Sequence, residues 1–106
     1  MTPPLVDFSR LRALEDELSA DDVRSLIGTF VETTQAMVSD LGTAIGSGAT
    51  SEAARIAHRV KGGALAIGAD ALADLAGRVE AGGEVAATQL SALWDQTVQA
   101  LHRSPS

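Results

Sequence analysis

The chain has 106 residues, a formal net charge of −6, 45% hydrophobic and 3% aromatic residues, and no cysteine. This length suits one domain, the absence of cysteine excludes disulfides and thiolate metal sites, and the acidic balance argues against nucleic-acid binding. No apolar stretch approaches the roughly 20 residues of a membrane span, and the first residues do not resemble a signal peptide. We therefore expect a cytoplasmic protein that does not enter the membrane.

Alanine and leucine are frequent and strand-forming aromatic residues are scarce, which predicts an all-α chain. The first predicted helix is short, covers about residues 7–17, and follows a segment that we expect to be frayed, Met1–Val6. The second begins after the capping signal Ser19-Ala20-Asp21-Asp22. Its long apolar stripe, which includes Phe30 and Met37, continues to Gly46 and is interpreted as core.

Glycines also delimit the remaining three predicted helices. These helices cover residues 50–67, about 69–81 and about 85–102, and a frayed tail is expected at residues 103–106. Trp94 lies on the apolar face of the last helix and is also assigned to the core. Short connections between long helices favour antiparallel neighbours, so we expect an up-down-up-down antiparallel four-helix bundle with a short additional N-terminal helix. One domain would then span residues 1–106.

The third predicted helix has a charged outer face. At about 100° per residue, Ile56, Val60 and Ile67 fall on one side, and His58 points directly away from them. Four residues lie near His58 on this outer face, at a spacing of three or four residues or one turn further on. They are Arg55, Lys61, Gly62 and Leu65. A histidine surrounded by cations in an acidic protein suggests that this face has a function beyond being solvated.

Gly62 strengthens this interpretation. Glycine inside a helix costs about 1 kcal/mol relative to alanine, and core packing cannot explain it on an exposed face. Without a Cβ one turn after His58, a bulky group can approach the imidazole closely. The alternative is an ordinary solvated face with an incidental histidine, which leaves Lys61 and Gly62 unexplained. His102, Asp70 and Asp74 are interpreted as solvated surface.

The segment His58-Arg59-Val60-Lys61-Gly62-Gly63-Ala64, followed by Gly68, Leu72, Leu75, Val79 and Glu80, resembles the histidine-containing phosphotransfer (HPt) family. The resemblance implies that His58 accepts a phosphoryl group, that Lys61 neutralises its oxygens, and that Gly62 gives access. It also implies that Glu80 orients the imidazole. Gly63 departs from the family pattern, where serine or another small residue is common, and should loosen the helix slightly.

The resemblance further implies a phosphorelay in which the phosphoryl group passes from an aspartyl phosphate to His58 and on to another aspartate. The expected partner is a response-regulator receiver domain, a hybrid histidine kinase, or both. A receiver would dock on the outer face of the third helix, at Arg55, Arg59 and Leu65. No carboxylate cluster in this chain resembles a Mg²⁺ site, so the receiver should supply the ion, and the stretch from Gly63 to Gly68 lacks the Lys-Ser/Thr ending of a phosphate loop. We therefore expect no cofactor, no metal site and no ATP site in this chain, which should be monomeric and not an autonomous enzyme.

Two alternatives remain open. A helical module could bind a receiver or kinase without phosphotransfer, and the absence of acid-labile phosphate on His58 would reveal it. A dimerisation-and-phosphoacceptor hairpin of a kinase is less consistent with the sequence, because such hairpins form a four-helix bundle from two chains. This chain has enough predicted helices to close a bundle alone.

Overall fold

The computed structural model describes residues 2–103, and this part of the chain contains five helices and no strand. The all-α prediction is confirmed, and each helix lies within two residues of its expected limits. The helices are α1 (Phe8–Glu17), α2 (Ala20–Gly46), α3 (Thr50–Ile67), α4 (Asp70–Glu80) and α5 (Ala87–His102). Ser19 caps α2 as predicted, because its Oγ accepts a hydrogen bond of 3.0 Å from the backbone N–H of Asp22.

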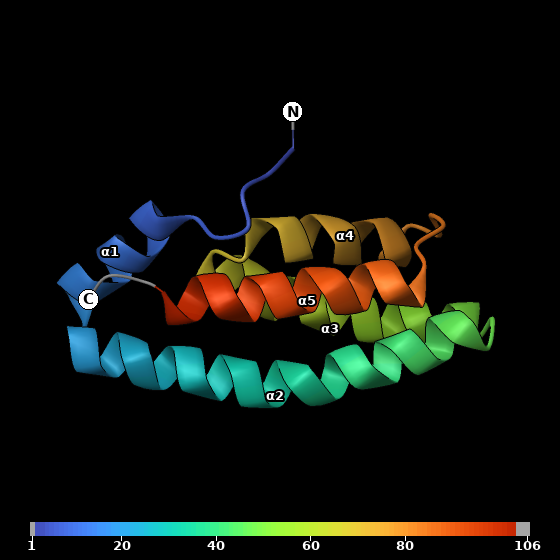
Figure 1. The fold of residues 1–106 in the computed structure, drawn as a ribbon, viewed down its shortest axis with the longest axis horizontal. Coiled ribbons are helices and arrows are strands. Elements are labelled where there is room, and N and C mark those ends of the chain that lie inside the picture. Colours follow the sequence, from blue (N-terminus) through green and yellow to red (C-terminus); the bar gives the residue numbers. More distant parts are fainter. Residues whose placement is uncertain (1, 104–106) are drawn as a thin grey trace.

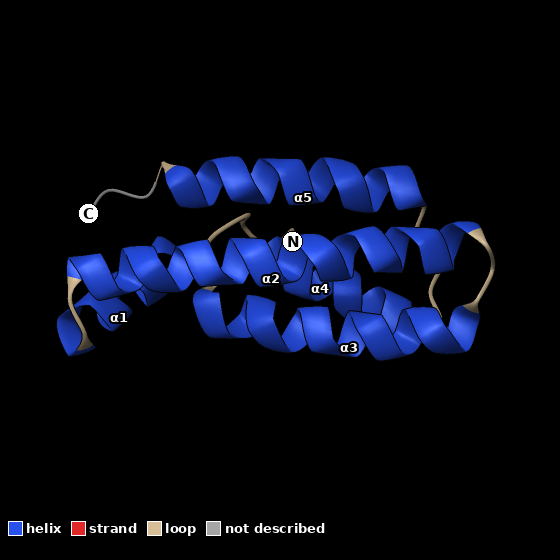
Figure 2. Ribbon diagram, turned by 90° about the horizontal axis from the view of Figure 1, so that it is seen from below, coloured by secondary structure: helices blue, strands red, loops and turns tan. Residues whose placement is uncertain are grey.

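The four longer helices lie side by side, and α1 lies at one end of them, beside the start of α2 (Figure 1). Seen from below, α2 lies between α3 and α5, with α4 behind (Figure 2). Helix α3 packs against α2 and α4, and α5 packs against the same two helices. The apolar stripes of all four helices therefore meet in one core, and each helix keeps an outer face.

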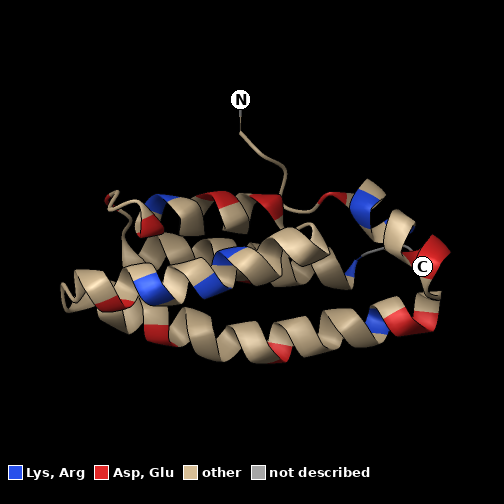
Figure 3. Ribbon diagram, turned by 180° about the vertical axis from the view of Figure 1, so that it is seen from behind, with Lys and Arg blue, Asp and Glu red and all other residues tan. Residues whose placement is uncertain are grey.

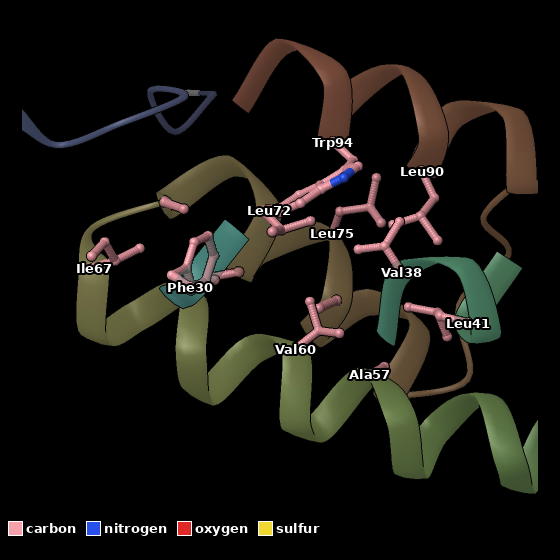
Figure 4. Packing of buried hydrophobic residues seen from close by; sticks show 14 of the residues in the cluster. Phe30, Val38, Leu41, Ala57, Val60, Ile67, Leu72, Leu75, Leu90 and Trp94 are labelled. Atoms are coloured by element: carbon pink, nitrogen blue, oxygen red, sulfur yellow. The ribbon is translucent and has the colours of Figure 1, made fainter. Parts of the chain in front are cut away.

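The core is aliphatic around two aromatic rings (Figure 4). Phe30 and Trp94 have ring centroids 6.0 Å apart, and Leu72 beside them is fully buried. The indole N–H of Trp94 donates a hydrogen bond of 2.8 Å to Oε1 of Gln35, so the one polar atom of the ring is satisfied. The core assignment of Phe30 and Trp94 is confirmed, and Met37 packs against the core while half-buried.

The segment before α1 is bound to the rest of the domain, so the predicted fraying of Met1–Val6 is wrong for its second half. The carbonyl of Pro4 accepts a hydrogen bond of 2.9 Å from the backbone N–H of Ala71, and Val6 is only 5% exposed. The physical reason is that α4 has no side-chain cap, and its first N–H groups need another acceptor. Met1 and the tail residues 104–106 lie outside the described residues.

Gly68 joins α3 to α4 in a conformation that favours glycine. Its φ is +86°, and the Asp7 N–H donates a hydrogen bond of 2.8 Å to its carbonyl. A Cβ at this position would lie 3.1 Å from Cβ of Arg10 and 3.2 Å from the carbonyl oxygen of Asp7. The turn that brings α4 back along α3 therefore depends on a residue without a side chain.

We expect Gly68→Ala to lower the free energy of unfolding by about 2 kcal/mol, because alanine in a left-handed conformation costs about 1–2 kcal/mol and the crowding adds to it. Gly48→Ala is the matched control, since Gly48 also has a positive φ, of +73°, but has open space around it. Urea denaturation of both variants measures the difference. Equal losses in the two variants would show that the contact with Arg10 and Asp7 costs nothing.

Candidate functional site

His58 lies in the middle of α3, on the side opposite the core. The predicted core face is confirmed, because Ile56, Val60 and Ile67 are 7%, 0% and 2% exposed. The side chain of His58 is 69% exposed. The helical period thus places the imidazole in solvent, where a second protein can reach it.

One carboxylate connects His58 with Lys61. Oε2 of Glu80 lies 2.6 Å from Nδ1 of His58, and Oε1 of the same side chain lies 2.6 Å from Nζ of Lys61. Glu80 is the last residue of α4, which packs against α3, so the contact joins two helices. Two contacts hold the pKa of Glu80 below its ordinary value. The contact with Lys61 is the larger cause, and the hydrogen bond with His58 is the second.

An ionised Glu80 determines which nitrogen of His58 carries the proton. A carboxylate only accepts hydrogen bonds, so Nδ1 of the imidazole must donate. In the neutral ring, Nε2 then carries the lone pair. Nε2 has no hydrogen-bond partner within residues 2–103, and the ring is largely exposed. The arrangement presents a nitrogen nucleophile to an approaching partner.

Basic residues follow one another along α3, on an otherwise acidic domain (Figure 3). Arg55 forms an ion pair with Glu52 on the same helix, and Lys61 forms its ion pair with Glu80. Arg59 is exposed and has no ion-pair partner in the described part of the chain. The predicted cationic surroundings of His58 therefore exist, but Arg59 carries the charge that remains available to a partner.

The outer face of α3 is open next to His58. Gly62 is exposed, and a Cβ at this position would have no neighbour within 4 Å. Leu65 is 56% exposed and lies with Lys61 in a shallow groove of about 570 Å³ between α3 and α4. On the other side, Gly63 borders a smaller apolar groove between α3 and α2. This face is thus a ridge with the imidazole on it and apolar surface on both sides.

Gly77 in α4 belongs to this site, although it is absent from the residues predicted from the sequence. A Cβ at Gly77 would lie 3.6 Å from Cδ of Lys61, and both residues line the groove between α3 and α4. A glycine within a helix is itself a signal, since it costs about 1 kcal/mol relative to alanine. What it contacts depends on how α4 packs on α3, which the helical period of α4 does not reveal.

The remaining titratable residues form no second site in the described residues. His102 is exposed at the end of α5, and Asp70 and Asp74 lie on α4 at the border of the groove with Leu65. Between residues 2 and 103, no three histidine, aspartate or glutamate side chains come together as metal ligands would. None of the helices described there has the length and apolar character needed to cross a membrane.

Comparison with protein families gives one match, the Hpt domain, over residues 8–104. Comparisons with curated proteins and with solved structures gave no match. The matched range contains all five helices and the cluster of His58, Lys61 and Glu80. Because the match covers nearly the whole chain, the chain belongs to the Hpt domain family, the histidine phosphotransfer domains of two-component phosphorelay signalling.

Proposed function

We propose that this chain carries a phosphoryl group on Nε2 of His58, which it receives from the aspartyl phosphate of one receiver domain and passes to the aspartate of another. Hpt domains work with receiver domains and histidine kinases, as carriers rather than as autonomous enzymes. The hydrogen bond between Glu80 and Nδ1 of His58 is the observation that carries the proposal. It leaves the lone pair on Nε2, in an exposed ring that a large partner can reach.

In the transfer step, the lone pair of Nε2 forms a bond to phosphorus while the bond between phosphorus and the aspartyl oxygen breaks. The aspartate leaves as a carboxylate with the bonding electron pair. Nδ1 keeps its proton, so the imidazole ring becomes positively charged, and the carboxylate of Glu80 stabilises this charge. Transfer onward is the same step in reverse, with a carboxylate oxygen of the second receiver as the nucleophile.

Lys61 has a place in this proposal beside Glu80. Phosphoryl transfer depends mainly on positioning and on stabilisation of the charged oxygens. The ammonium of Lys61 lies one turn from His58 and is bound to Glu80 in the unphosphorylated protein. We propose that it also neutralises oxygens of the phosphoryl group. The divalent cation would come with the acidic pocket of the receiver, and the chain itself would use no cofactor.

The proposal includes an up-down-up-down order of α2 to α5 that closes the bundle within a single chain. A monomer of this kind, acting in the cytoplasm, would need only one exposed face for its partners. The outer face of α3 fits this requirement, because it combines the imidazole, the exposed Leu65 and Arg59, which has no ion-pair partner among residues 2–103. The receiver or kinase domain would place its acidic pocket over His58.

The test is a transfer reaction with receiver domains charged with radiolabelled acetyl phosphate. The expected result is a label on the peptide that contains His58, stable in base and labile in acid, as a phosphoryl group on nitrogen is. A module that only binds would form the complex and take no label. Label on an aspartate or glutamate, or on His102, would contradict the proposal.

Gly62→Gln should slow phosphoryl transfer by about 10-fold or more, because its side chain would occupy the space through which the receiver approaches His58. Gly62→Ala should raise the free energy of unfolding by up to about 1 kcal/mol, because alanine has the higher helix propensity. This variant should transfer the phosphoryl group nearly as fast as the parent. Rapid-quench transfer assays, with circular dichroism for the fold, compare the two. A wild-type rate in Gly62→Gln would show that access to the imidazole does not need a glycine.

A further inference from the structure

The side chain of Lys61 extends from α3 across the surface of α4. Where it passes over α4, the residues of α4 are small. Gly77 is half-buried in the interior of α4, and Ala73 and Ala81 border the same groove one turn before and after it. Lys61 starts on α3, and its Nζ reaches Glu80, which lies one turn beyond Gly77 on α4. The side chain of Lys61 is only 34% exposed, so its aliphatic part is covered along this path.

We propose that Gly77 is a positioning residue of the phosphoacceptor site, because it leaves room for the stem of Lys61 to cross α4 and bind Glu80. A Cβ at Gly77 would lie 3.6 Å from Cδ of Lys61, which is an ordinary van der Waals contact. Alanine therefore fits, but any atom added beyond the Cβ on this side would occupy the space of the lysine stem. The position accepts a methyl group, whereas a larger side chain directed toward the groove would displace the stem of Lys61.

The consequence reaches His58 through two contacts. Lys61 binds one oxygen of Glu80, and the other oxygen holds Nδ1 of the imidazole. If a bulky residue displaces Lys61, Glu80 loses its cation and with it the main cause of its lowered pKa. The carboxylate is then no longer anchored on the side of Lys61, so its other oxygen is held less firmly in position against Nδ1 of His58. Only the effect on phosphoryl transfer rests on the proposed function, since the contacts themselves can be measured without it.

The experiment is a carbon NMR titration of the carboxyl group of Glu80, assigned by its disappearance in Glu80→Gln. Gly77→Ile places two γ carbons beyond a Cβ that already touches Lys61, and Gly77→Leu is a second bulky variant. Lys61→Met removes the ammonium and keeps the stem. The matched control is Gly28→Ile, because Gly28 is an exposed glycine within α2 and a Cβ there has no neighbour within 4 Å.

We expect the pKa of Glu80 to shift upward in Gly77→Ile by the same amount as in Lys61→Met, and to stay unchanged in Gly77→Ala and Gly28→Ile. The double variant Gly77→Ile with Lys61→Met should show no shift beyond that of Lys61→Met, since both changes act through the lysine. An unchanged pKa in both bulky variants, or an equal further shift in the Lys61→Met background, would overturn the proposal.

Phosphoryl transfer to the same proteins separates this inference from the proposed function. If wild-type protein takes no label but the titrations behave as expected, the positioning role stands and the carrier function fails. If wild-type protein is labelled on His58 and the bulky variants leave the pKa of Glu80 unchanged, the carrier function stands and the positioning role of Gly77 fails.

Discussion

Replacing His58 by glutamine should abolish phosphoryl acceptance and leave the fold intact. The side chain is 69% exposed and lies opposite the core of α3, so the substitution disturbs no packing. The glutamine side chain can still form hydrogen bonds with water, but its amide nitrogen has no lone pair available for attack on phosphorus. We expect the rate of labelling by a charged receiver to fall by at least about 10³-fold, as when a catalytic nucleophile is removed.

His102→Gln is the matched control, because the chain has two histidines and this one lies at the exposed end of α5. It should accept the phosphoryl group at the wild-type rate. Circular dichroism and urea denaturation should show equal stability for the parent and both variants. A folded His58→Gln protein that still acquires acid-labile phosphate would remove His58 from the role of acceptor.

Leu65→Asp should weaken the docking of a receiver more than any other surface change on α3. Leu65 is 56% exposed beside the groove between α3 and α4, where a partner can bury it. Aspartate removes this apolar contact and adds a negative charge that faces the acidic pocket of the receiver. A cost of about 2 kcal/mol raises Kd by about 30-fold.

Isothermal titration calorimetry, with an unphosphorylated receiver titrated into each variant, measures this loss of affinity. The matched control is Leu18→Asp, since Leu18 is 52% exposed in the turn between α1 and α2. Arg59→Ala should mainly slow association at low salt, and more than Arg55→Ala, whose charge is already paired with Glu52. If Leu65→Asp binds the receiver as tightly as Leu18→Asp does, the docking surface is not the outer face of α3.

The orientation of α3 could be predicted because the helical period alone decides which residues share a face. Ile56 and Val60 at four-residue spacing define the buried side, and His58 must then be exposed. The helix limits were equally accessible, since glycines and a capping serine mark them locally. These features depend on residues within a turn or two of one another.

The contacts between helices could not be predicted in the same way. Glu80 is separated from His58 by 22 positions, and only the family resemblance pointed to it. The sequence did not indicate that Lys61 forms an ion pair with Glu80 in the unphosphorylated domain. The bond between Pro4 and Ala71 was missed because a Pro-rich segment has no period that would reveal what it packs against.

The pairing of Trp94 with Phe30 and Gln35 gives the domain an internal optical reporter. The chain has one tryptophan and no tyrosine, so its near-ultraviolet absorption and emission come almost wholly from Trp94. Trp94 on α5 is 2% exposed, and its indole N–H is hydrogen-bonded to Gln35 of α2. The imidazole of His58, by contrast, lies on the outer face of α3. The emission of Trp94 should therefore shift to longer wavelength when the core opens and stay constant when a tryptophan-free receiver covers His58. Fluorescence can thus distinguish a variant that has lost its partner from one that has lost its fold, without any added dye.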